Sequence, residues 1–165
     1  MGETYIELLV KKKQTTADLL LRYALLGLTI SFGLVGIVFQ PIILFGALIF
    51  GVITYFVNLF TDLEYEYCYL DKQITIDKVM ARTKRKKIMT IEFDRMEILA
   101  PLNSHQLDVY KNRPGKVIDY SSGQAKQPES RYMMIYDGGK KIILEPNEEM
   151  LKMIRSVAPR KTFLD

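Results

Sequence analysis

Five cationic side chains fall within one six-residue stretch of the sequence: Arg82, Lys84, Arg85, Lys86 and Lys87. Each cation held near an anionic membrane surface gains about 1 kcal/mol of attraction, so this stretch could bind acidic lipid headgroups. A solvated β-hairpin turn is the alternative interpretation, because charges at a sheet edge also deter pairing with other chains. Both interpretations stay open on the sequence alone.

The chain has one cysteine and one histidine, Cys68 and His105. One thiol cannot form an intrachain disulfide, and these two side chains are too few for the tetrahedral ligand set of a structural zinc site. We expect Cys68 to pack within a strand and His105 to lie on the surface. The sequence therefore predicts neither a metal site nor a bound cofactor.

Two further motifs contain reactive residue types without the spacing of a reactive site. The stretch Arg113-Pro114-Gly115-Lys116 has a Gly-Lys pair but lacks the upstream glycine and the following hydroxyl residue of a phosphate-binding loop. The adjacent Glu148 and Glu149 suit the positive end of a helix dipole better than the roles of acid and base. No nucleophile with a base is visible, so we predict no catalytic residues and a protein that is not an enzyme.

A long uncharged segment precedes the cationic stretch. No Asp, Glu, Lys or Arg occurs between Tyr23 and Phe60, although 25% of the chain is charged. Soluble domains seldom have such a run, because each of their helices and strands keeps a polar face. A helix of roughly 20 apolar residues crosses the hydrocarbon core of a bilayer. Residues 19–39 and 42–60 meet this length, so residues 19–60 are predicted to form a hairpin of two transmembrane helices.

The two apolar stretches are separated by Gln40-Pro41. Proline lacks the N–H that a continuous helix uses, so we place the turn of the hairpin at residues 40–41. Small residues are expected to let the two helices approach closely. They are Gly27, Gly33 and Gly36 on the first helix, and Gly46, Ala47 and Gly51 on the second. A cleaved signal peptide fits the first stretch poorly, because the stretch is too long and no cleavage site is evident.

Cations lie before the first apolar stretch and near its start, whereas the turn of the hairpin has no charge. They are Lys11, Lys12, Lys13 and Arg22. The positive-inside rule therefore predicts that both termini are cytoplasmic and that these four residues anchor the hairpin at the membrane interface. Residues 1–18 are predicted to be a cytoplasmic N-terminal segment. Part of it, residues 5–18, is an irregular candidate for a short interfacial helix.

After Phe60 the apolar residues alternate with polar ones, which predicts β-strands. These strands, joined by short connections in an antiparallel meander, are expected at residues 64–69, 73–78, 88–93 and 95–99. Pro, Gly and Ser interrupt residues 102–130, where we expect a loop and two extended candidates, 107–111 and 116–120. A hairpin is predicted at residues 131–144, because Gly138 and Gly139 supply the positive φ angles of its turn.

The first predicted strand and the C-terminus have clear apolar patterns. Tyr65, Tyr67 and Tyr69 share one face of the strand, and we expect them in the core rather than in an aromatic binding surface. The last element is predicted to be a helix over residues 147–158. Its start is marked by Asn147 and two glutamates, and it ends before Pro159. Its apolar stripe must pack against the sheet.

Several segments of this pattern resemble a known family. They are Gln73-Ile74-Thr75-Ile76-Asp77, the cationic stretch 82–87, residues 91–98 and residues 141–157. Up to seven short antiparallel strands followed by one amphipathic helix resemble a pleckstrin-homology-like (PH-like) domain. Over most of the chain, roughly Leu19 to Pro159, the sequence resembles the bacterial membrane-anchored PH-like proteins. This resemblance implies a two-helix membrane hairpin before a mainly antiparallel β domain, here residues 61–165 with a C-terminal helix. It implies no site residue.

The leading functional hypothesis is a non-enzymatic adaptor at the bacterial cytoplasmic membrane. Its hairpin would hold the PH-like domain at the inner surface, where the cationic stretch or a sheet edge binds a lipid headgroup or a protein partner. An accessory subunit of a membrane complex or transporter is the alternative, with the membrane helices making the main contacts. The net charge of +4 is too small and too mixed in sign to indicate nucleic acid.

Overall fold

The computed structural model describes residues 5–164. The two outermost ends of the predicted segments 1–18 and 61–165, which are residues 1–4 and 165, lie outside the described residues. The described chain forms two compact units. A helical unit contains residues 14–63 and 80–84, and a β unit contains residues 5–13, 64–79 and 85–164.

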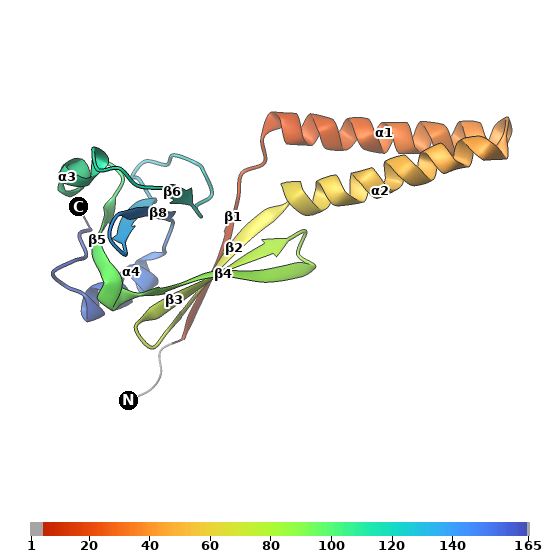
Figure 1. The fold of residues 1–165 in the computed structure, drawn as a ribbon. Helices are drawn as coiled ribbons and strands as arrows, with labels where there is room; N and C mark the ends of the chain where they lie inside the picture. Colours follow the sequence, from red (N-terminus) through yellow and green to blue (C-terminus); the bar gives the residue numbers. More distant parts are fainter. Residues whose placement is uncertain (1–4, 165) are drawn as a thin grey trace. The chain divides into compact units, whose positions relative to one another are not determined.

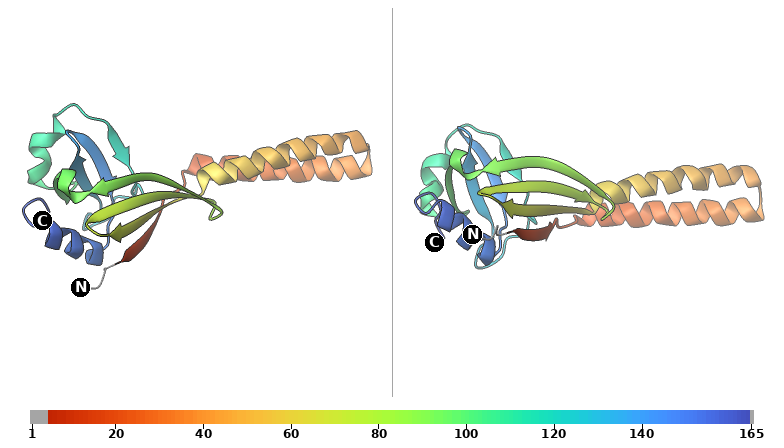
Figure 2. Two further views of the ribbon diagram at one scale, coloured as in Figure 1. Left: turned by 60° about the horizontal axis from the view of Figure 1, so that its bottom comes forward. Right: turned by 90° about the horizontal axis from the view of Figure 1, so that it is seen from below.

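The helical unit is built on two long helices that lie side by side (Figures 1 and 2). They are α1, Thr16–Val38, and α2, Leu44–Thr61. The backbone N–H of Thr15 donates to Asp18 Oδ2 at 3.0 Å, which closes the first turn of α1. Between the helices the chain turns at Phe39 and Gln40 and enters a short 3-10 helix, η1, Pro41–Ile43. Pro41 opens η1 because the first position of a helix needs no N–H.

Two glycines near the turn allow α1 and α2 to approach closely. A Cβ added at Gly36 would lie 2.9 Å from the backbone nitrogen of Leu44. A Cβ added at Gly46 would lie 2.7 Å from the ring of Phe32. Both distances are too short for a real contact, so a larger residue would push the helices apart.

The other glycines of the hairpin differ in how closely the neighbouring helix approaches them. A Cβ at Gly51 would make an ordinary 3.7 Å contact with Thr29. In the described part of the chain, Gly27 and Gly33 have no heavy atom within 4 Å of such a Cβ. The prediction of close approach is therefore confirmed near the turn and at Gly51, and it is wrong for Gly27 and Gly33.

The outward side chains of both helices are apolar and exposed. Leu20 of α1 is 67% exposed and Ile37 is 76% exposed, and Phe45 of α2 is 70% exposed. A core helix of a soluble protein would have most of this surface covered. By length and composition, both helices are long and apolar enough to cross a membrane.

The first sheet of the chain contains a strand that the sequence did not indicate. Its order is β1-β2-β3-β4, with β1 at Ile6–Lys11, β2 at Leu63–Leu70, β3 at Gln73–Met80 and β4 at Lys84–Glu92. β1 pairs with β2 in antiparallel register from Ile6 opposite Tyr69 to Lys11 opposite Glu64. The interfacial helix considered for residues 5–18 is therefore wrong over β1. The long helices are an insertion in the β1–β2 connection.

The second sheet has the order β5-β7-β8-β6. Its strands are β5 at Met96–Pro101, β6 at Val117–Asp119, β7 at Tyr132–Tyr136 and β8 at Lys140–Leu144. The predicted hairpin of β7 and β8 is confirmed, whereas β6 runs parallel to β8 and departs from the antiparallel expectation. A short 3-10 helix, η2, Phe93–Arg95, joins the two sheets in sequence.

Residues 105–111 are helical, so the extended candidate at 107–111 is wrong. They form η3, His105–Leu107, and α3, Asp108–Lys111. The hydroxyl of Ser104 accepts a hydrogen bond from the backbone N–H of Gln106 at 3.3 Å, which favours a helical start. Leu107 is fully buried against the second sheet with Ile98 and Ile135.

The core of the β unit lies between the two sheets and α4, Glu148–Val157 (Figure 1). The α4 helix confirms the predicted C-terminal helix, and the Asn147 side chain accepts from the Met150 backbone N–H at 2.9 Å. The fully buried side chains of this core are Tyr67, Ile74, Ile76, Ile91, Met96, Leu99, Met134, Ile142, Leu144, Met150 and Ile154. A mostly antiparallel β fold with one packed helix is the result.

Candidate functional site

The predicted cationic residues lie at the β3–β4 turn and along the first half of β4. We call Arg82, Lys84, Arg85, Lys86 and Lys87 the basic cluster. All five are exposed. Ala81 and Arg82 occupy the left-handed region, with φ of 46° and 54°, and the Thr83 N–H donates to the Met80 carbonyl at 3.1 Å. Two left-handed residues give a turn whose twist matches the strands it connects.

The turn that begins the basic cluster is bonded to the end of α2. The backbone N–H of Ala81 donates to the carbonyl oxygen of Asp62 at 2.7 Å. Asp62 is the C-cap of α2, and its own N–H donates to Asn58 at 3.1 Å. The side-chain amide of Gln14, just before α1, donates to Asp62 Oδ1 at 3.4 Å. The first cation of the cluster therefore follows directly after a residue that is hydrogen-bonded to the C-cap of α2.

One cation of the cluster has a buried partner. Arg85 Nη2 lies 2.9 Å from Glu66 Oε1 in an ion pair. The Arg85 side chain is 60% exposed, but that of Glu66 is 0% exposed. Glu66 alternates along β2 with the buried Tyr65 and Tyr67, so it occupies the face of the sheet opposite the core.

A second carboxyl group, that of Glu7, changes the pKa of Glu66. Burial and a hydrogen bond with Glu7 raise the pKa of Glu66 to about 7, although Arg85 opposes this shift. The pKa of Glu7 is lowered, because Glu66 and then Tyr5 hydrogen-bond to its carboxylate. The Tyr5 hydroxyl donates to Glu7 Oε2 at 3.0 Å. Of these two carboxyl groups, Glu66 is therefore the one that is more readily protonated.

The four cations predicted to anchor the hairpin lie on either side of the helix start. Lys11 ends β1, and Lys12 and Lys13 follow it, all three exposed. The backbone N–H of Lys13 donates to the Ser122 carbonyl at 2.8 Å, so this residue begins in the β unit. Arg22 is half-buried within α1. Their contact with a membrane interface stays a prediction.

The tyrosine stripe belongs to the core, as predicted. Tyr65, Tyr67 and Tyr69 are 6%, 1% and 4% exposed. The Tyr67 hydroxyl donates to the Tyr120 carbonyl at 2.6 Å and accepts from the Glu145 N–H at 3.3 Å. The Tyr67 hydroxyl therefore links the first sheet to the segment after β6 and to the end of β8.

The remaining reactive side chains make contacts that are typical of structural roles. Cys68 is half-buried, and burial raises the pKa of its thiol, which is opposite to the shift that a nucleophile needs. His105 is fully exposed, with Nδ1 at 3.4 Å from Asp108 Oδ2. Glu148 and Glu149 are exposed in the first turn of α4. Residues 5–164 contain no group of three or more side chains suited to hold a metal ion.

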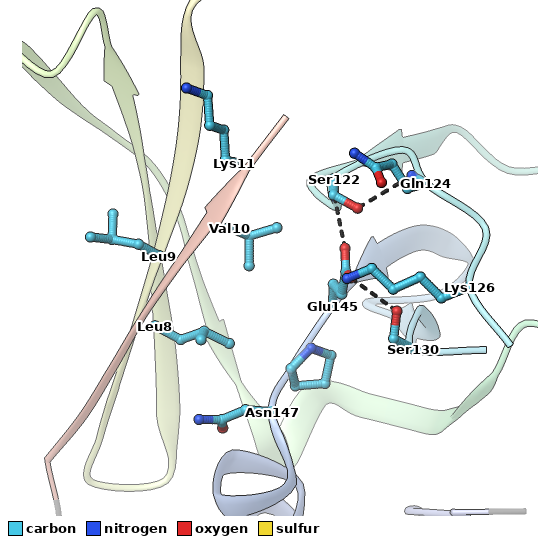
Figure 3. Close-up of a pocket in the computed structure, with 11 residues that line it drawn as sticks. Leu8, Leu9, Val10, Lys11, Ser122, Gln124, Lys126, Ser130, Glu145 and Asn147 are labelled. Atoms are coloured by element: carbon cyan, nitrogen blue, oxygen red, sulfur yellow. Dashed lines mark hydrogen bonds and ion pairs between the residues drawn. The ribbon is translucent and has the colours of Figure 1, made fainter. Parts of the chain in front are cut away.

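A cavity of about 410 Å³ that the sequence analysis did not predict borders β1 (Figure 3). Leu8 and Val10 point toward it, and Glu145 lies on its opposite side. Burial opposes the charge of Glu145, but hydrogen bonds from Lys126, Ser122 and Ser130 outweigh it and lower the pKa to about 2. The carboxylate accepts from Lys126 Nζ at 2.7 Å and from Ser130 Oγ at 2.9 Å. Glu145 therefore fixes the 122–130 loop and is already satisfied.

The chain matches the family described as bacterial PH-like domain (DUF6106) over residues 2–164. It belongs to this family. The predicted resemblance is thus confirmed, and the match includes both long helices as well as the two sheets. Neither the curated proteins nor the solved structures gave a match. PH-like domains are generally non-catalytic.

Proposed function

We propose that this bacterial PH-like protein is a non-enzymatic adaptor anchored in the cytoplasmic membrane. In this proposal α1 and α2 cross the bilayer, both termini are cytoplasmic, and the PH-like domain lies at the inner surface. The basic cluster contacts anionic lipid headgroups there and orients the domain for a protein partner. The exposed apolar side chains of the two helices support the anchoring, since lipid solvates such surface better than water.

The observation that carries the lipid contact is the hydrogen bond from Ala81 to Asp62. If α2 ends at the membrane interface, the residue bonded to its C-cap lies within the headgroup layer. Arg82 follows Ala81 directly, and Lys84 is two residues further on. Clustered cations at that depth gain about 1 kcal/mol each from an anionic leaflet.

Sheet topology gives independent support. The membrane hairpin connects β1 to β2, and β2 runs antiparallel to β1. In a meander of order β1-β2-β3-β4, the end of β3 and the start of β4 lie at the same end of the sheet as that connection. Lys11 and the β3–β4 turn therefore share the end of the sheet from which the helices depart.

The test needs the full chain, because a fragment of residues 61–165 would lack β1. A Thr83→Cys variant in a Cys68→Ser background is labelled with a small fluorophore and reconstituted in lipid nanodiscs. Quenching by a nitroxide on the lipid headgroup reports how close the turn lies to the surface. We expect stronger quenching in discs containing phosphatidylglycerol than in phosphatidylcholine discs. The difference should shrink at high salt, which screens exposed charges.

Two variants act as controls. Replacing Lys84, Lys86 and Lys87 by Gln should remove the phosphatidylglycerol effect. A label at Lys72→Cys marks the β2–β3 turn, at the opposite end of an eight-residue strand β3, roughly 26 Å away at about 3.3 Å per residue. That label should show no lipid-dependent quenching. Equal quenching at position 83 in neutral and anionic discs would contradict the proposed lipid contact.

A further inference from the structure

The burial of Glu66 is unusual for a carboxyl group on the face of a sheet opposite the core. Its side chain is fully buried, and its Oε2 atom has no hydrogen-bond donor among residues 5–164. Its other oxygen pairs with Arg85, a member of the basic cluster. A carboxylate with one unsatisfied buried oxygen is costly, and a proton on that oxygen removes the cost.

The charged groups that face Glu66 come from every neighbouring strand. Glu7 of β1 and Asp77 of β3 carry negative charge, and Arg85 of β4 carries positive charge. Asp77 Oδ1 is itself buried without a donor in the described chain. Cys68 lies two residues further along β2, and its Sγ atom accepts a hydrogen bond from the Tyr5 hydroxyl at 3.8 Å. Two acidic neighbours oppose ionisation of Glu66, and one arginine favours it.

We propose that protonation of Glu66 releases Arg85 to the membrane, so that contact between the basic cluster and anionic lipid strengthens as the pH falls through neutrality. This inference rests on the proposed lipid contact and adds its regulation. When Glu66 is ionised, its carboxylate holds the guanidinium of Arg85. When Glu66 takes up a proton, its O–H can donate to the Glu7 carboxylate, and the guanidinium loses the negative charge at its 2.9 Å contact.

The exchange is balanced in charge and protons. One proton from solvent binds Glu66, and the guanidinium of Arg85 moves from a carboxylate to a lipid phosphate without changing its own protonation. By linkage, an anionic surface that attracts Arg85 also raises the pKa of Glu66 further. Arg85 lies three residues after Arg82 in sequence, roughly 10 Å along an extended chain, and its long side chain covers much of that distance.

The test uses the same labelled full chain in phosphatidylglycerol nanodiscs, titrated from about pH 8 to about pH 6, where the lipid phosphodiester keeps its charge. We expect the ratio of membrane-bound to unbound β3–β4 turn to rise about fivefold as the pH falls over this range. This is the effect of adding one cation near the anionic surface. A Glu66→Gln variant should show the low-pH ratio at every pH. Because Glu7 raises the pKa of Glu66, Glu7→Gln should move the midpoint to lower pH.

Each result has a defined meaning. A lipid-dependent but pH-independent ratio would overturn this inference and leave the lipid contact standing. No dependence on phosphatidylglycerol at either pH would overturn the lipid contact itself. An unmoved midpoint in Glu7→Gln, or a response that disappears in His105→Gln, would overturn the assignment to Glu66. A retained response in His105→Gln supports the assignment, since His105 is the one histidine of the chain.

Discussion

The backbone N–H of Ala81 donates to the carbonyl oxygen of Asp62 across 2.7 Å. This single bond joins the β3–β4 turn to the C-cap of α2, a helix long and apolar enough to cross a membrane. It also explains how an ordinary hairpin turn acquires a fixed place near the helix end. The proposed role of the basic cluster follows from that connection more than from the number of its charges.

Close approach of the two long helices depends on Gly36 rather than on Gly33. We expect Gly36→Ala to lower the thermal stability of the detergent-solubilised hairpin, because its Cβ would lie 2.9 Å from the Leu44 nitrogen. The loss should be about 1 to 3 kcal/mol, as for overpacking elsewhere. Gly33→Ala, in the same helix with open space around it, is the matched control and should be neutral or slightly stabilising. Equal effects of the two variants would contradict the helix packing described here.

The hydroxyl of Tyr67 holds two buried backbone groups. Tyr67→Phe removes the bond to the Tyr120 carbonyl and leaves the Glu145 N–H without this acceptor. We expect a loss of about 1 to 3 kcal/mol in the stability of the β unit, because buried polar groups are left unpaired. Urea unfolding followed by circular dichroism measures the loss. Tyr69→Phe, which keeps the ring stacked on Phe93 at 5.9 Å, serves as the comparison and should cost less.

Glu145 makes the stability of the 122–130 loop depend on acid pH. Its pKa falls from the ordinary 4.5 to about 2, so the carboxylate stabilises the folded form above pH 4.5. That stabilisation should be lost as the pH falls from 4.5 to about 2. The protection factors of the loop amides, corrected for the intrinsic exchange rate at each pH, should fall in this range in the wild-type chain.

Substitution of Glu145 separates the carboxylate from its exposed partner. In Glu145→Gln the low protection of the loop amides should already be present at neutral pH, with a loss of about 2 kcal/mol from the missing charged hydrogen bonds. Lys126→Met should cost less, about 1 kcal/mol at most, because this lysine is 55% exposed. Unchanged loop exchange in Glu145→Gln would mean that the carboxylate does not fix the loop.

Much of the fold could be predicted from local patterns. The alternation of Tyr65, Tyr67 and Tyr69 identified a buried strand face, and Gly138-Gly139 identified the β7–β8 turn. Strand β1 could not be predicted in this way, because its partner lies across the inserted helices, with Ile6 opposite Tyr69. The apolar residues of β1 and the lysines after it form a pattern that also suits an interfacial helix.

The candidate site was only partly visible in the sequence. The basic cluster is a local feature and could be read directly. The burial of Glu66 could not, since it occupies the alternating position that is normally solvated, and Arg85 and Glu7 come from different strands. The prediction of an extended segment at residues 107–111 is wrong because the Ser104 hydroxyl and the burial of Leu107 favour a helical turn.

Accessibility of single cysteines in intact bacteria tests the central claim most directly. In a Cys68→Ser chain, the account predicts that Gln40→Cys, at the hairpin turn, reacts with a membrane-impermeant maleimide added outside the cells. Thr83→Cys, in the basic cluster's turn, should react only after the cells are permeabilised. Reaction of position 83 in intact cells, or a protein that alkaline washing removes from the membrane, would contradict a hairpin that holds the basic cluster at the cytoplasmic surface.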